Sequence, residues 1–240
     1  MPPRLPTPEL DFCGLHAECY AYMLYNWQTL IGGLIAIGAA VYAGRFVRRQ
    51  INAGEKIEAE RIRKREMAAR AVLPLTLTKF IDFSEECAEM VRHLHATDIP
   101  AQSISGLTLT APAIPQTAIT DLERTIEAAT DERAVELLTK LAGHTQVLHS
   151  ILTDLVARTN MRGNRGYQRD PNRPVWELRT ARVHAVASGM FRWARREVAT
   201  PEDITWENIE ASLSLLNIGD EAVAEMIKRA RERQRPPLDW

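Results

Sequence analysis

The chain has 240 residues, of which 45% are hydrophobic and 25% charged, and its formal net charge is −1. Such a balanced total gives no electrostatic reason to expect nucleic acid as a partner, and three cysteines are too few for a disulfide scaffold. The charge is nonetheless divided into blocks, because residues 45–72 are basic whereas residues 73–159 are acidic. Blocks of opposite charge indicate that these parts of the chain face different environments, such as a membrane surface or the solvent.

Residues 1–26 form a short segment that begins with prolines and predicts a helix with Thr7 as its N-cap. We expect this segment to be extracytoplasmic or to lie at the membrane surface. Cys13, His16 and Cys19 are spaced by three, but a zinc site there lacks a fourth ligand. We therefore predict no metal and no cofactor. The sequence leaves a Cys13–Cys19 disulfide open.

The most apolar stretch is LIGGLIAIGAAVYA, residues 30–43, and it predicts a transmembrane helix over residues 27–47. As a helix, this segment is as long as the hydrocarbon core of a bilayer is thick, ~30 Å. Trp27 and Tyr42 lie where interfacial aromatic residues are expected. A cleaved signal peptide is disfavoured because basic residues follow the apolar run rather than precede it. A buried soluble helix is disfavoured by the adjacent glycines.

The basic flank also predicts the orientation of this helix. The positive-inside rule places residues 73–240 in the cytoplasm and the N-terminus outside. Small residues recur every four positions along the helix at Gly32, Ala36, Ala40 and Gly44. Such a face lets two transmembrane helices approach closely, which favours a homodimer. The alternative is that Gly and Ala are simply common in membrane helices.

Residues 48–72 predict a basic juxtamembrane helix that continues out of the membrane, supported by the Glu60–Lys64 pair at i,i+4. Their apolar residues keep no steady heptad, so an extended coiled coil is only weakly supported. Pro74 is expected to interrupt or kink this helix. The positive charge is explained by membrane topology, which makes nucleic-acid binding the less favoured interpretation.

Residues 73–240 predict an all-α fold, a cytoplasmic helical bundle. Their strongest periodicity alternates steps of four and three, as in a core helix. This stripe comprises Ala134, Leu138, Leu141, Thr145, Leu148, Leu152 and Leu155, widened by Val135, Val147, Ile151 and Val156. Residues 96–115 contain three prolines and predict a loop, in which Leu107 and Leu109 favour at most a short extended stretch.

Several helix boundaries are predicted by capping patterns. Thr120 and Glu123 form a capping-box pattern, and the alternative is that this helix begins a few residues earlier. Another helix is predicted over roughly 175–198. Thr200 or Thr205 begins the next helix, and Asp220 caps the last one, which ends before two prolines.

Asp82, Glu86, Glu89 and His93 share one helical face, as ligands of a di-metal site do. The Glu-x-x-His pairs that such a site needs are absent, so we interpret these residues as a solvated acidic face. The chain contains no P-loop, dinucleotide motif, nucleophile elbow or zinc-protease motif. We therefore predict no catalytic residues.

The best candidate for a functional surface is the loop of residues 160–174. Its candidate anion-contacting residues are Arg162, Arg165, Tyr167, Arg169 and Arg173, backed by Arg179 and Arg182. Arginines beside a stackable ring can grip phosphates of lipid headgroups or of single-stranded RNA. An exposed loop whose charge complements the acidic block of residues 73–159 explains the same pattern, and this is the interpretation we favour.

The stretches YNWQTLIGGLIAIGAAVYAGRFVRRQ and AARAVLPLTLTKFIDFSEECAEMV give the chain a resemblance over about residues 25–95. It resembles a recurrent type of uncharacterised proteobacterial protein, a single-pass membrane anchor with a helical cytoplasmic tail. The resemblance implies a location in the bacterial inner membrane. It implies no established activity, and no functional residue is carried over from it.

Together these features favour a non-enzymatic, membrane-anchored interaction or scaffold module that faces the cytoplasm. The expected partners are the lipid bilayer, a second copy of the chain paired through the transmembrane helix, and a further protein. The alternative is a membrane-tethered enzyme or effector that acts on a nucleic acid, a nucleotide or a phospholipid headgroup through the loop of residues 160–174.

Overall fold

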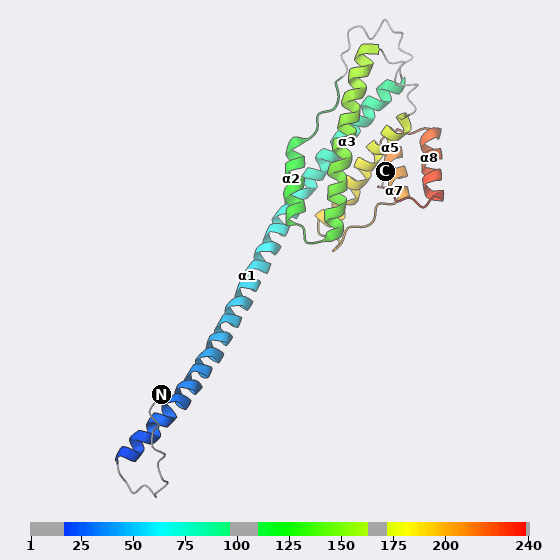
Figure 1. Ribbon diagram of the computed structural model, residues 1–240. Helices are drawn as coiled ribbons and strands as arrows, with labels where there is room; N and C mark the ends of the chain where they lie inside the picture. The colour runs from blue at the N-terminus through cyan, green and yellow to red at the C-terminus, as the bar shows by residue number, and fades with distance from the viewer. Residues whose placement is uncertain (1–16, 97–109, 163–171, 239–240) are drawn as a thin grey trace, which may run out of the picture. The chain divides into compact units, whose positions relative to one another are not determined.

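The computed structural model describes residues 17–96, 110–162 and 172–238. The structure is 82% helical and the described residues contain no strand, which confirms the predicted all-α class. Figure 1 shows the helices in chain order: α1 (Ala17–Ala96), α2 (Gln116–Ala128), α3 (Glu132–Arg162), α5 (Arg173–Gly189), α6 (Phe191–Ala194), α7 (Trp206–Leu215) and α8 (Glu221–Glu232). The extended stretch predicted at Leu107 and Leu109 lies outside the described residues.

The chain divides into two units, residues 1–61 and 62–240. In the first unit the described residues are all helical, and every side chain described there is exposed. The second unit holds the hydrophobic core, whose first member along the chain is Leu73. The described part of the first unit is therefore an exposed helical segment that contributes no residue to this core.

Helix α1 runs through Pro74 without a break, so of the two outcomes predicted there, an interruption or a kink, the interruption is wrong. Proline removes one backbone hydrogen bond and costs a helix interior ~3 kcal/mol. The neighbouring side chains Leu73 and Leu77 are both fully buried in the core. Burial of two such side chains contributes about 3–6 kcal/mol and offsets the lost hydrogen bond.

Helix α5 is the centre of the second unit, because it packs against α3, α6, α7 and α8. From Trp176 to Ala187 every residue except Arg179 is buried, and even Glu177 and Arg182 are at most 1% exposed. The expectation that Arg182 backs an exposed surface is therefore wrong. A helix covered on every side has no polar stripe from which its exposed residues can be predicted.

The predicted core stripe of α3 is confirmed, since none of its seven residues is more than 3% exposed. Two differences concern its width. Leu137 is also fully buried, whereas Val147 is 41% exposed. Only the part of this helix that faces α2 and α5 needs to be apolar.

The capping predictions have mixed outcomes. Thr205 begins α7 with a reciprocal capping box to Asn208, and Asp220 caps α8 through the backbone N–H groups of residues 222 and 223. Thr120, however, lies inside α2, which begins at Gln116, and its hydroxyl donates to the Gln116 carbonyl oxygen at 3.2 Å. Proline at position 115 starts that helix instead, since the missing N–H costs nothing there.

The helix predicted over 175–198 is shorter in the structure. It begins at Arg173 and ends at Gly189, and the four-residue helix α6 follows. Arg196 then takes a φ of 64°, which no α-helix continues through. Its guanidinium donates to the carbonyl oxygen of Met67 at 2.8 Å and so holds the turn against α1.

Two glycines give a matched pair of expected results. A Cβ added at Gly189 would lie 2.6 Å from Cδ1 of Ile204, whereas one added at Gly143, inside α3, would meet nothing within 4 Å. Cδ1 of Ile204 is the far end of a flexible side chain and can move aside at little cost, so Gly189→Ala should gain less stability than Gly143→Ala. Gly143→Ala should raise the free energy of unfolding by about 0.5–1 kcal/mol through helix propensity. Urea unfolding of both variants, followed by circular dichroism, compares the two gains; a larger gain for Gly189→Ala would contradict the packing at that residue.

Candidate functional site

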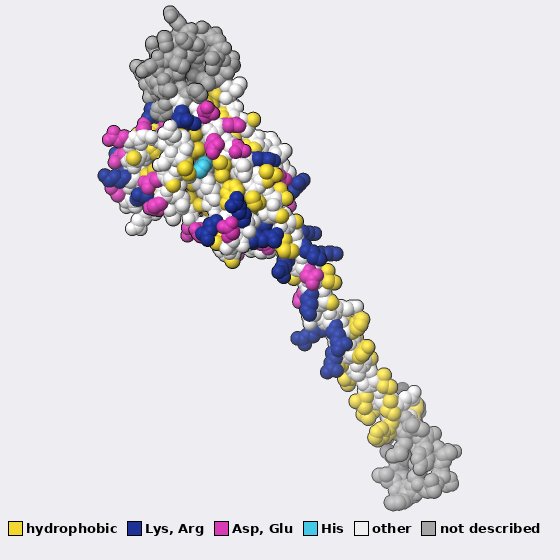
Figure 2. All heavy atoms as spheres, turned by 180° about the vertical axis from the view of Figure 1, so that it is seen from behind, with side chains coloured by type: hydrophobic (Ala, Val, Ile, Leu, Met, Phe, Trp, Pro, Cys, Tyr) yellow, Lys and Arg dark blue, Asp and Glu magenta, His cyan; other side chains and the backbone are white. Residues whose placement is uncertain are grey.

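The apolar segment of the first unit is long and apolar enough to cross a membrane, by length and composition. None of its most apolar 18-residue window is buried. Figure 2 shows hydrophobic side chains along this part of the helix, followed by a group of Lys and Arg side chains. Arg45, Arg48 and Arg49, which follow the apolar segment in the sequence, are all exposed.

The predicted pairing face of this helix is open. Gly32, Ala36, Ala40 and Gly44 are exposed, and a Cβ added at either glycine would meet no atom within 4 Å. Nothing in the chain itself covers this face among the described residues. The side chains of Cys13, His16 and Cys19 lie outside the described residues.

Most of the arginine-rich loop also lies outside the described residues, namely Arg165, Tyr167, Arg169 and the side chain of Arg162. Arg173 is described at the start of α5, where its side chain is 19% exposed. It pairs with Glu177 at 3.5 Å and with Asp220, the N-cap of α8. Two carboxylates thus already engage the described arginine of this loop, in a contact that joins α5 to α8.

The predicted acidic face borders a groove of about 410 Å³. Asp82, Glu86 and Glu89 line it together with Glu85 and with residues 215–217 at the end of α7. The described part of the chain contains no group of three or more side chains placed to hold a metal ion. The side chain of His93 is not among those described.

Two buried polar contacts join α5 to α7. His184 on α5 lies 3.0 Å from the hydroxyl oxygen of Ser212 on α7, through its Nδ1 atom. The guanidinium of Arg182 lies 5.9 Å from the ring centroid of Trp206. The Trp206 indole N–H in turn donates to the Arg235 carbonyl oxygen at 3.1 Å.

Burial lowers the pKa values of two histidines in this part of the core. Desolvation lowers the pKa of His144 on α3 to about 4, helped by the positive charges of Arg182 and Arg179. Desolvation likewise lowers the pKa of His184, against a smaller opposing effect of Glu85. Both imidazoles are therefore neutral at pH 7, and the positive charge in this part of the core belongs to the arginines.

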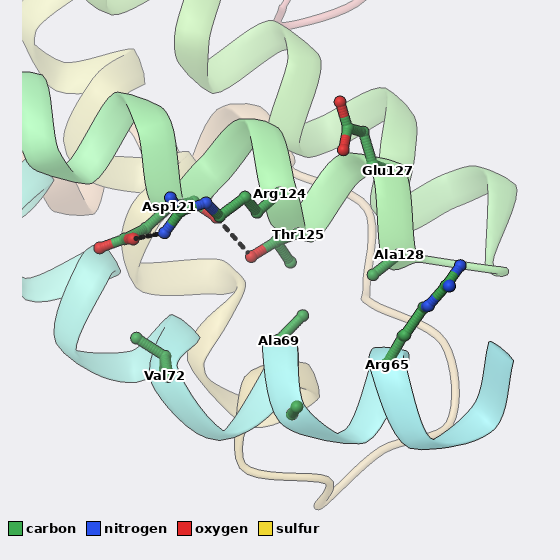
Figure 3. A pocket seen from close by; sticks show the side chains of 9 residues that line it. Arg65, Ala69, Val72, Asp121, Arg124, Thr125, Glu127 and Ala128 are labelled. Carbon is green, nitrogen blue, oxygen red and sulfur yellow. Dashed lines mark hydrogen bonds and ion pairs between the residues drawn. The ribbon is translucent and has the colours of Figure 1, made fainter. Parts of the chain in front are cut away.

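A second groove, of about 510 Å³, lies between α1 and α2 (Figure 3). Its apolar floor consists of short side chains, contributed by Ala68, Ala69, Val72 and Ala128. Charged side chains surround this floor, namely Arg65 on α1 and Asp121, Arg124 and Glu127 on α2. We refer to this site as the α1/α2 groove.

The α1/α2 groove offers few polar groups to orient a small ligand. The hydroxyl of Thr125 donates to the Asp121 carbonyl oxygen at 2.8 Å, and Arg124 pairs with the Asp121 carboxylate at 3.6 Å. Figure 3 shows both interactions along the upper wall. Ligand pockets in proteins usually have several convergent polar groups over an apolar lining. An open groove with an alanine-rich floor and a charged rim is better suited to another helix.

Sequence reasoning missed this groove because its two walls come from segments about fifty residues apart. One part of the pattern was visible: Arg65, Ala68, Ala69 and Val72 follow helical steps of three and four. The comparisons with known proteins add nothing to the geometry, since no protein-family model, curated protein or solved structure matches the chain.

Proposed function

We propose that the chain is a membrane-anchored helical interaction module. Residues 27–47 would anchor it in a bacterial inner membrane, and the second unit, a helical bundle, would face the cytoplasm. One observation carries this proposal. Seven large apolar side chains between Leu30 and Tyr42 are 44–75% exposed.

Leaving these side chains in water is unfavourable. Burying a large apolar side chain is worth about 1.5–3 kcal/mol, so covering seven partly exposed ones recovers on the order of 10 kcal/mol. A bilayer provides that cover along the whole segment. The proposed orientation, with the second unit in the cytoplasm, follows from Arg45, Arg48 and Arg49, because the anionic cytoplasmic leaflet attracts positive charge. The small-residue face of Gly32, Ala36, Ala40 and Gly44 would then be free for close helix pairing.

Membrane extraction tests the anchor. The full-length chain should stay in the membrane pellet after washing with alkaline carbonate and with 1 M salt, because hydrophobic insertion is insensitive to both. The triple variant Leu34→Arg/Ile35→Arg/Ile37→Arg should move to the soluble fraction, because each charge near the centre of a membrane helix costs about 2.5–3.5 kcal/mol and three together offset the gain on the order of 10 kcal/mol. Thr78→Arg/Thr139→Arg/Ser214→Arg, at three exposed positions of the second unit, is the matched control and should remain in the pellet. Full-length protein in the soluble pool would contradict the proposal.

A further inference from the structure

We propose that the α1/α2 groove is an interface between two copies of this chain, related by a two-fold axis parallel to the part of α1 that lines the groove. The proposal deepens the proposed function, because it names the partner of the interaction module. It rests on that function in one respect: anchoring in one bilayer brings two copies of the chain together. The argument for a second copy comes from the charges of the groove and their heights along the helices.

Two hydrogen bonds establish how the walls of the groove are aligned. Glu66 on α1 accepts from the Thr130 hydroxyl at 2.9 Å, and Lys79 on α1 donates to the Thr117 hydroxyl at 3.1 Å. Helix α2 is therefore antiparallel to α1: Thr117 near its start lies beside Lys79, and Thr130, two residues beyond its end, lies beside Glu66. On this alignment, the positions of Glu127 and Arg65 along the helix axis differ by one helical turn, about 6 Å.

The rim of the groove is complementary to itself. It carries two arginines and two carboxylates, so it has no net charge to repel a second copy. A parallel two-fold axis keeps each residue of the partner at the height of its own equivalent. Arg65 of each copy then comes within reach of Glu127 of the other, and this contact occurs twice. In the described part of the chain, Arg65 and Glu127 form no ion pair with another residue.

The surface next to the groove supplies apolar contacts for the same pairing. Val72 in the floor is 49% exposed and Leu75, one turn further along α1, is 64% exposed. Both lie on the outer face of a helix whose inner face, at Leu73 and Leu77, is fully buried. Apolar side chains at the centre with charges around them are the usual arrangement of a protein interface.

Cross-complementation of charge tests this pairing in the full-length chain. Val72→Cys reports proximity across the axis by disulfide formation under mild oxidation. The background carries Cys13→Ser and Cys19→Ser, and the buried Cys87 is left in place. Onto this background we add either Arg65→Glu or Glu127→Arg, with a different tag on each chain, in detergent micelles. Each variant alone places two like-charged pairs at the interface, and its crosslinking should fall about tenfold.

Mixing the two variants decides the question. In a heterodimer of Arg65→Glu with Glu127→Arg, both contacts become opposite-charge pairs, so crosslinking between the differently tagged chains should return to the parental level. The double variant Arg65→Glu/Glu127→Arg in one chain should recover in the same way. Contacts within one chain cannot produce rescue by mixing. Parental crosslinking by either single variant, or a mixture no better than the two alone, overturns the proposal.

The outcome is separable from that of the proposed function. Crosslinking in micelles measures the groove, whereas carbonate extraction measures the anchor. If the chain is soluble but mixing restores crosslinking, the interface is supported and the membrane anchor is contradicted. If the chain stays in the membrane but mixing restores nothing, the anchor is supported and the interface is contradicted.

Discussion

Trp193→Ala is expected to lower the free energy of unfolding by about 3–5 kcal/mol, the usual cost of removing a large buried aromatic side chain. Trp193 is fully buried and is the largest side chain in the core with that status. The guanidinium of Arg70 lies 4.4 Å from the centroid of its ring. Arg70 also donates to the Trp193 carbonyl oxygen and pairs with Glu66 at 3.8 Å. Removing the indole therefore leaves both a cavity and a partly desolvated cation without its ring.

Trp193→Phe is the matched control and should cost much less. Phenylalanine keeps a ring beneath Arg70, and it removes an indole N–H that is buried without an acceptor among the described residues. A buried unsatisfied donor costs about 1–3 kcal/mol, which compensates for part of the lost volume. Urea unfolding followed by circular dichroism at 222 nm provides the measurement. Equal destabilisation by both variants would contradict the stacking of Arg70 on this ring.

The second large effect is a loss of stability as the pH falls from about 6.5 to about 4. His144 has its pKa lowered to about 4 by burial, with contributions from Arg182 and Arg179. Between these values the unfolded chain binds a proton at His144 and the folded chain does not. Protonation therefore favours unfolding, and the stabilising contribution is complete only above pH 6.5. A difference of 2.5 pKa units corresponds to about 3 kcal/mol. The lowered pKa of His184 acts in the same direction.

His144→Gln tests this assignment, because it removes the titrating group. Its stability should fall less steeply between pH 6.5 and 4 than that of the parent, although its stability at pH 7 is lower. His149→Gln is the control on the same helix, at a half-buried ring whose Nδ1 lies 3.1 Å from the Pro112 carbonyl oxygen. That variant retains His144 and should keep the parental slope. An unchanged slope in His144→Gln would assign the acid sensitivity to other groups.

The features that were predictable from sequence are those governed by local pattern. The α3 stripe, the Thr205 and Asp220 caps and the all-helical class all follow from helical periodicity and capping chemistry, which act over a few residues. Continuity of α1 through Pro74 was not predictable, because it depends on the burial of Leu73 and Leu77 by distant helices.

The candidate sites show the same division. The exposed apolar segment and its small-residue face are visible in sequence, since each lies on one helix. Burial of Arg182 was not predictable, because an arginine on a central helix has the same sequence pattern as one on a surface helix. The α1/α2 groove was missed for a related reason: its charge complementarity exists only once α2 lies antiparallel to α1.

The contacts of residues 235–238 have a consequence for synthesis. Leu238 belongs to the core, and the Arg235 carbonyl oxygen accepts from Trp206. The central helix α5 is covered by α7 and α8, which leave the ribosome after it. The apolar segment of α1 emerges long before these elements, so the membrane insertion proposed for it would precede completion of the core. During that interval the apolar stripes of α1 and α3 would still be uncovered, and exposed apolar surface of this kind makes an incomplete chain prone to aggregation.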